Sequence, residues 1–248
     1  MDVHITQFNV QLYFHHAVLK NTDLLNIMFS KSEGFTASQM QKYDDGNNHP
    51  YPKTQNILSF FKEGFRIAPV QSNVLPFRIL QVLSYPNALQ NPDKETIACL
   101  HHVAALLRQY LKIDIETDIY AVRVVFHSIV TGSSNVQRIL TKLTRIDNVP
   151  TLADKYVGHK NPMDAMQFTY KTGGDLLHKF WNDIRVSQFN TNSYVVTIFN
   201  ETDSLASSLD FIKNVKQFVT TFMHEMEEAA IATSTSSSIN PIKKEEKD

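Results

Sequence analysis

Three acidic residues at alternate positions, Asp114, Glu116 and Asp118, stand just before an apolar run and are the first candidates for chemistry. Carboxylates at the entry to a strand can bind Mg²⁺ and support hydrolysis of phosphate esters. The lysine that often accompanies such carboxylates is missing, and Arg123 is the nearest cation. A polar entry to a strand explains this spacing more simply. A metal-dependent hydrolase or nuclease therefore stays as one alternative function.

The histidines and glycines give little support to a metal or nucleotide enzyme. The chain has 10 histidines, but its adjacent pairs, His15-His16 and His101-His102, would point apart on a helix or a strand. Cys99 is the only cysteine, and the 7 glycines include no phosphate-binding loop. We therefore expect no native metal site, no cofactor and a non-catalytic protein.

A basic stripe is predicted on a helix that begins near Ser134. Arg138, Lys142 and Arg145 follow one another at steps of four and three residues, which places them on one helical face. Such a stripe can contact phosphates of a nucleic acid. Solvent-facing helix positions are also commonly Lys or Arg. A nucleic-acid-associated protein is accordingly the second alternative function.

Two predicted strands carry polar residues at alternate positions. Gln7, Asn9 and Gln11 share one face of the first strand, and Arg123 and His127 share one face of a later strand. If these strands are neighbours, the five side chains form a recognition surface. The competing interpretation is an exposed sheet face without a partner, or one covered by another subunit.

These residues need a scaffold of strands and long amphipathic helices. The apolar pattern alternates over residues 3–14 and is nearly continuous over residues 119–130, which predicts one half-buried and one central strand. Asn91-Pro92 suits the start of a helix, and an apolar stripe from Leu205 predicts a final helix of about 24 residues. Further strands are predicted at residues 65–70, 77–83, 166–170, 184–189 and 194–199.

Two polar stretches, residues 31–56 and 147–164, lack a periodic pattern and are interpreted as long loops. From residue 232 the chain is rich in Ser and Thr and then charged, which predicts a disordered tail over 232–248. On the last helix, we expect Met223, Met226 and the acidic group around Glu227 to project beyond the sheet, toward another chain.

The order of elements favours an α+β fold. We expect a mixed or mainly antiparallel sheet with helices packed chiefly on one face. A single compact domain is predicted over residues 1–231. Its two similar halves would span 1–130 and 131–231.

The composition fits an intracellular binding protein. Charged residues make up 20% of the chain, and the formal net charge is −1, which argues against a globally basic nucleic-acid binder. With one cysteine there is no intrachain disulfide, and no apolar run is long enough to span a bilayer. The leading hypothesis is a cytoplasmic, non-catalytic binding or regulatory protein that acts in a protein assembly or as a homo-oligomer.

Overall fold

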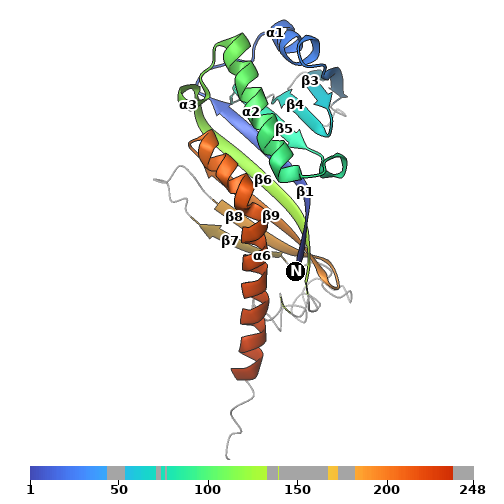
Figure 1. Ribbon diagram of the computed structural model, residues 1–248, viewed down its shortest axis with the longest axis vertical. Helices are drawn as coiled ribbons and strands as arrows, with labels where there is room; N and C mark the ends of the chain where they lie inside the picture. The colour runs from blue at the N-terminus through green and yellow to red at the C-terminus, as the bar shows by residue number, and fades with distance from the viewer. Residues whose placement is uncertain are drawn as a thin grey trace, which may run out of the picture.

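In the computed structural model, an antiparallel sheet of nine strands forms the centre of the molecule (Figure 1). The structure describes residues 1–43, 54–70, 74–75, 77–132, 139, 167–172 and 182–236. The strands are β1 (Asp2–Phe14), β2 (Thr36–Tyr43), β3 (Thr54–Lys62), β4 (Phe65–Pro69), β5 (Ile79–Ser84), β6 (Ile119–Thr131), β7 (Gln167–Thr172), β8 (Asn182–Asn190) and β9 (Ser193–Thr202).

All neighbouring strands pair antiparallel, in the order β2-β3-β4-β5-β1-β6-β9-β8-β7. The predicted α+β fold with a mainly antiparallel sheet is confirmed. The predicted strand pair around residues 65–83 is also confirmed, since β4 and β5 pair directly. Residues 31–56 are not a single irregular loop, because β2 and the start of β3 fall within that range.

Two long helices lie on the same side of the sheet (Figure 1). They are α2 (Pro92–Leu111) and α6 (Leu205–Ser236). The chain also forms four short helices, α1 (Thr22–Asn26), η1 (Ile27–Lys31), η2 (Pro86–Ala88) and α3 (Ile115–Asp118). α2 contacts β5, and α6 contacts β1, β6 and β9. Asn91 does not cap α2 with its side chain; the Glu95 carboxylate instead accepts the backbone N–H groups of Gln90 and Asn91, at 2.9 and 2.6 Å.

The main core lies between this face of the sheet and the helices. Alternate residues of the central strands are fully buried there, including Phe8, Val10 and Phe126. The Phe8 and Phe126 rings meet at 5.3 Å between centroids. Burial of such side chains contributes roughly 1.5–3 kcal/mol each, so this face holds the sheet and helices together.

The last helix is longer than predicted and its buried face continues farther. α6 runs through Ser236, so residues 232–236 are helical, while 237–248 lie outside the described residues. Met223, Met226 and Glu227 are buried, so the expectation that these three project beyond the sheet is wrong, whereas Glu225 and Glu228 of the predicted acidic end are exposed. The Tyr194 hydroxyl donates to Glu227 Oε1 at 3.0 Å, which ties this part of α6 to β9.

The sheet consists of two similar halves around its centre. Outward from the centre, the strand order is β1-β5-β4-β3-β2 in one half and β6-β9-β8-β7 in the other, so the first half has β2 as an additional edge strand. Each half begins with its central strand and ends with a long helix, α2 or α6. The topological repeat therefore starts with β6, whereas the predicted division at residue 130 falls near the end of that strand.

Candidate functional site: the open face of the sheet

The face of the sheet opposite the helices carries the five polar residues predicted from the strand patterns. β1 and β6 are neighbours, and their register places Gln7 opposite His127 and Gln11 opposite Arg123. Asn9 lies between the two glutamines on the same face. All five side chains are half-buried. We call the face that carries these residues the open face, because α1, α2, α3 and α6 place their buried apolar side chains in the core on the other side.

Polar residues of the flanking strands extend the rows across the open face. On β5, Gln81 lies opposite Gln11, and its Nε2 donates to Asn9 Oδ1 at 2.9 Å. On β9, Thr197 lies opposite His127 and Glu201 lies opposite Arg123. One polar row, Gln81–Gln11–Arg123–Glu201, thus crosses four adjacent strands, and a second, Gln7–His127–Thr197, crosses three. Between them, the register neighbours of Asn9 are the apolar Leu83, Val125 and Phe199.

Glu201 and Tyr13 hold Arg123 in one orientation. Its Nε and Nη2 donate to Glu201 Oε2 at 2.9 and 2.6 Å. Its guanidinium lies over the Tyr13 ring at 5.4 Å from the centroid, and the Tyr13 hydroxyl donates to Gln11 Oε1 at 2.6 Å. A charge-assisted pair of hydrogen bonds together with a cation–π contact orders a side chain that is otherwise flexible.

The same arrangement occurs on β4. Arg66 donates from Nε and Nη2 to Ser59 Oγ, at 3.1 and 3.0 Å, and lies 6.0 Å from the centroid of the Phe61 ring. Ser59 is neutral, and among the described residues no ion pair of Arg66 with a carboxylate is formed.

A third arginine of this kind lies on β8. Arg185 donates from Nε and Nη2 to Asp183 Oδ2, at 3.1 and 2.9 Å, and lies 4.6 Å from the centroid of the Phe199 ring. The three arginines therefore come from β4, β6 and β8, and each has its guanidinium over an aromatic ring of an adjacent strand. The open face presents planar cations at fixed positions in both halves of the sheet.

His127 lies between these arginines and is neutral at pH 7. Its Nδ1 is 3.0 Å from Thr197 Oγ1, and burial lowers the pKa of the imidazole below its ordinary value. Burial likewise raises the pKa of the Tyr13 and Tyr120 hydroxyls, which stay protonated. The charges of the open face at neutral pH therefore come from its arginines and carboxylates.

One end of the open face has a small apolar cover. Tyr13, Ile79 and Ala121 form a separate buried cluster, with Val70, Leu75 and Tyr120 packed against it. The rings of Tyr13 and Tyr120 meet edge to face at 5.9 Å. Among the described residues this cluster is confined to one end, and the rows from Gln7 to Gln11 continue beyond it.

The predicted acidic site has a structural role instead. Asp114 caps α3, and its Oδ1 accepts the Glu116 N–H at 3.3 Å and the Arg108 guanidinium at 3.0 Å. These hydrogen bonds, that of Arg108 first, lower the pKa of Asp114. Asp118 Oδ2 accepts the Asp114 N–H at 2.7 Å. Within the described part of the chain, no three His, Cys, Asp or Glu side chains are grouped to hold a metal.

Arg138, Lys142 and Arg145 lie outside the described residues, as does the loop predicted over 147–164. The arginine–aromatic contacts of Arg66 and Arg185 were not predicted from the sequence. Arg185 and Phe199 each lie in a predicted strand, so alternation along the strands could have predicted the face on which each side chain lies. Their contact depends in addition on the β8–β9 register, which the sequence pattern does not give. Phe61 lies on β3, which the sequence pattern did not reveal.

Comparisons of this chain with protein-family models, with curated proteins and with solved structures found no match. No helix in the described ranges is long and apolar enough to cross a membrane.

Proposed function

We propose that the chain is a non-catalytic binding protein that acts in a macromolecular assembly, with the open face as its recognition surface. One observation carries this proposal: polar side chains lie in register across β5, β1, β6 and β9, with three arginines fixed on aromatic rings in the same face. These groups can donate hydrogen bonds to a partner and accept hydrogen bonds from it.

Because these side chains are already fixed, less side-chain conformational entropy is lost when a partner binds. Immobilising a flexible side chain costs roughly 0.5–1.5 kcal/mol on binding. The hydrogen bonds and ring contacts of Arg66, Arg123 and Arg185 already restrict these side chains. Arginine and tyrosine are also the residues that contribute most often to the energy of protein interfaces.

The size and charge of the open face suit a protein partner. Nine strands about 4.8 Å apart span roughly 38 Å, and strands of nine residues are about 30 Å long. A standard interface uses about 800 Å² on each partner. Glu201 and Asp183 compensate two of the three arginines, so the surface is suited to a mixed polar partner. The setting that we propose is the reducing cytoplasm, where a chain with one cysteine needs no disulfide.

Photo-crosslinking tests this proposal. A photoreactive amino acid is placed at Thr197 on the open face or, as the matched control, at exposed Thr117 on α3. After irradiation in an extract of the cells that express the chain, Thr197 should give one defined adduct of higher mass that the control lacks. Equal patterns at the two positions, or no adduct at Thr197 in a folded chain, would contradict the proposal.

A nucleic-acid duplex is the second candidate partner. The open face has an approximate two-fold axis between β1 and β6, where its two similar halves meet. A duplex has two-fold axes of its own, and protein symmetry often matches that of the bound site. Asn, Gln and Arg are also the side chains that contact base edges in the minor groove. These are the residue types found near this axis.

Fluorescence anisotropy with labelled duplexes at low salt separates this candidate from a protein partner. Binding through the open face should weaken at least tenfold in Arg66→Glu, with a smaller salt dependence, and should be unchanged in the exposed control Lys112→Glu. Binding lost only in a variant with Arg138, Lys142 and Arg145 reversed would assign it to the basic stripe. No binding at low salt would exclude the nucleic-acid candidate and leave the protein partner.

A further inference from the structure

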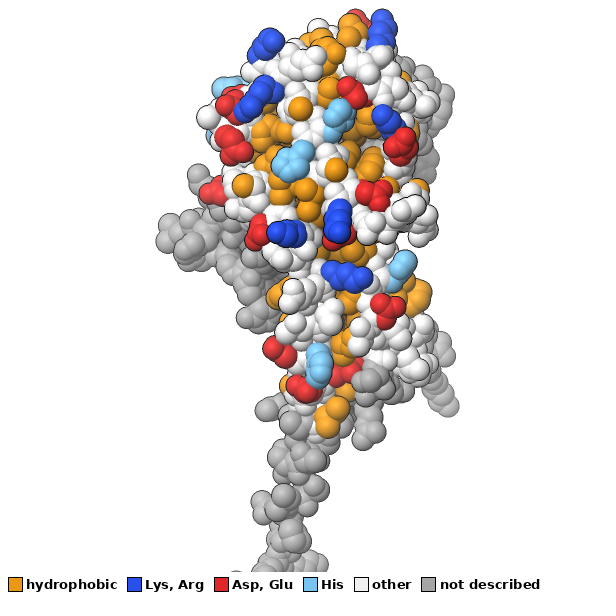
Figure 2. Space-filling view, viewed as in Figure 1, with side chains coloured by type: hydrophobic (Ala, Val, Ile, Leu, Met, Phe, Trp, Pro, Cys, Tyr) orange, Lys and Arg blue, Asp and Glu red, His pale blue; other side chains and the backbone are white. Residues whose placement is uncertain are grey.

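An apolar groove lies on the helix side of the molecule, between α2, α3 and the first turns of α6. Its volume is about 520 Å³. Figure 2 shows this side of the molecule, with hydrophobic side chains visible between the charged ones. The floor consists of Ala104, Ala105, Ile115, Leu205, Ala206 and Leu209.

Small side chains make this groove accessible to a helix from another chain. Three of the six floor residues are alanines, and Ala105 and Ala206 are exposed. An amphipathic helix binds such a groove by inserting apolar side chains, while charged residues at its margins set its orientation. His101, Arg108, Gln109 and Glu116 line the groove as well, and Arg108 is paired with Asp114 at 3.0 Å, so the margin of the groove is polar and carries charges of both signs.

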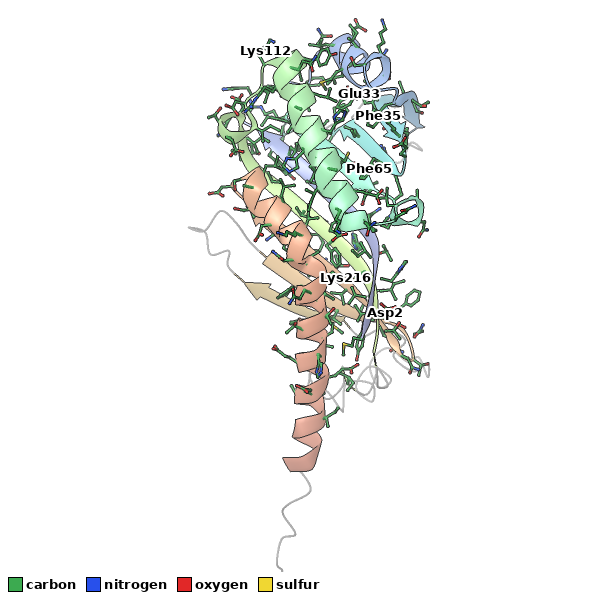
Figure 3. The ribbon with its side chains drawn as sticks, viewed as in Figure 1. Asp2, Glu33, Phe35, Phe65, Lys112 and Lys216 are labelled. Carbon is green, nitrogen blue, oxygen red and sulfur yellow. The ribbon has the colours of Figure 1, made fainter. Side chains whose placement is uncertain are left out.

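The solvent-facing side of α6 has opposite charges in its two halves. Exposed Lys213 and Lys216 lie in the first half, where α6 crosses the sheet (Figure 3). Exposed Glu225 and Glu228 lie in the second half, which continues past the end of β1. Asp210 is an acid in the first half, and its Oδ1 accepts the side-chain amide of Asn214 at 3.0 Å.

The second half of α6 also has an exposed apolar side chain. Ile231 is 52% exposed. Steps of three, four or seven residues connect Ala206, Lys213, Gln217, His224, Glu228 and Ile231, so these residues follow one side of the helix. The same side of α6 therefore borders the groove at its beginning and presents Ile231 near its end, roughly 37 Å away at 1.5 Å per residue.

We propose that two copies of the chain associate through these surfaces, with their α6 helices antiparallel. Ile231 of the second copy would enter the groove beside Ala206, and Glu228 of one α6 would lie within about one helical turn of Lys213 of the other. A two-fold axis near Phe218 repeats both contacts, which is the closed, self-complementary type of interface most common in homodimers. The open face is not used, so a dimer could still bind its partner.

The expected association is moderate in strength. A contact about 37 Å long and one helix diameter wide lies at the small end of specific interfaces, which suggests a dissociation constant in the micromolar range. Sedimentation equilibrium of the full chain from about 1 to 200 μM covers that range. A chain that is monomeric throughout this range would overturn the proposal.

Single substitutions on each surface test the two contacts. Ile231→Glu and Ala206→Glu should each weaken dimerisation at least about tenfold. Both positions are exposed, so the fold should persist, which circular dichroism verifies. The matched controls are Ala98→Glu, on an exposed part of α2 outside the groove, and Lys20→Glu, in an exposed turn. Controls that weaken dimerisation as much as the test variants would overturn the proposal.

Mixing the two variants provides a sharper test. In a mixture, the intact Ile231 of the Ala206→Glu chain can enter the intact groove of the Ile231→Glu chain, so one of the two contacts is restored. Heterodimers should therefore form at concentrations where neither variant self-associates. Absence of heterodimers would contradict the exchange of Ile231 between grooves.

Charge exchange tests the antiparallel orientation. Lys213→Glu should weaken the dimer, and the double variant K213E/E228K should restore it at least in part, because both charges of the pair are then reversed. Loss of the dimer in Arg185→Glu, with no effect of Ile231→Glu, would instead place self-association on the open face. That result would overturn this proposal and leave the function proposed for the open face standing.

Discussion

At the scale of single residues, the open face is defined by what holds each polar side chain. Arg123 contacts Glu201 and Tyr13, while His127 contacts Thr197. Alternation along each strand was enough to predict that Gln7, Asn9 and Gln11 share a face. The partners of Arg123 could not be predicted, because they lie on strands whose register depends on the whole sheet.

His127 should make stability depend on pH. Burial lowers its pKa in the folded chain, so the unfolded chain, with a histidine pKa of about 6.5, takes up a proton first as the pH falls. This contribution to stability is therefore complete above about pH 7 and is lost progressively below about pH 6.5. Between pH 7.5 and pH 5.5, the free energy of unfolding measured in urea should decrease less in His127→Gln than in the unmodified chain. If the exposed control His16→Gln reduced the pH dependence of the free energy of unfolding by the same amount, the role of His127 would be contradicted.

Cys99 should react slowly while the chain is folded. Burial raises the pKa of its thiol to about 12, so little thiolate exists at pH 8. Iodoacetamide should label the native chain about a hundredfold or more slowly than the urea-unfolded chain. Mass spectrometry over time gives both rates, and similar rates would show that the thiol is accessible and ionised.

At the scale of elements, local turn geometry connects strands that the hydrophobic pattern alone did not reveal. Glu63 and Gly64 both have positive φ, 45° and 82°, and join β3 to β4 in a two-residue hairpin. Positive φ at both positions fits the right-handed twist of the strands. β2 was missed because Thr36–Tyr43 is largely polar, so its pairing with β3 is not visible as an alternation of apolar residues.

Substitution of Gly64 should destabilise the chain more than substitution of Gly34. In Gly64→Ala the new Cβ would lie 2.9 Å from Leu89 Cδ2 and 3.0 Å from Ala88 Cβ, in addition to the backbone strain. At Gly34, also with positive φ, nothing lies within 4 Å of the new Cβ. We expect a loss of about 1–3 kcal/mol for Gly64→Ala and the smaller strain alone for Gly34→Ala, measured by urea unfolding. Equal losses of unfolding free energy in the two variants would show that the contact of the new Cβ with Ala88 and Leu89 does not contribute.

At the scale of the whole molecule, α6 connects the two halves of the sheet by packing on β1, β6 and β9. Its amphipathic stripe predicted a helix against a sheet, and the α+β class followed from the order of elements. The nine-strand order and the central β1–β6 pair could not be predicted, because similar apolar strands can pair in many ways. The recognition surface depends on that pairing and so became visible only in the structure.

The hydroxyl of Tyr194 should contribute to the attachment of α6. Tyr194 is fully buried and donates to the buried Glu227 carboxylate, and burial, together with this carboxylate, raises the pKa of the phenol. Tyr194→Phe leaves the carboxylate without this donor and should cost about 1–3 kcal/mol. The control Tyr110→Phe removes an exposed contact with Ser32 and should cost less than about 0.5 kcal/mol. Thermal or urea unfolding compares the two variants.

The most direct test of the open face as a recognition surface is hydroxyl-radical footprinting of the chain, alone and in an extract of the cells that express it. If a partner covers the open face, His127, Phe199 and Tyr120 are oxidised more slowly in the extract. His102, on the exposed side of α2, should be oxidised at an unchanged rate. Equal rates at the open-face residues in the two samples, or protection of His102 alone, would contradict the proposed function.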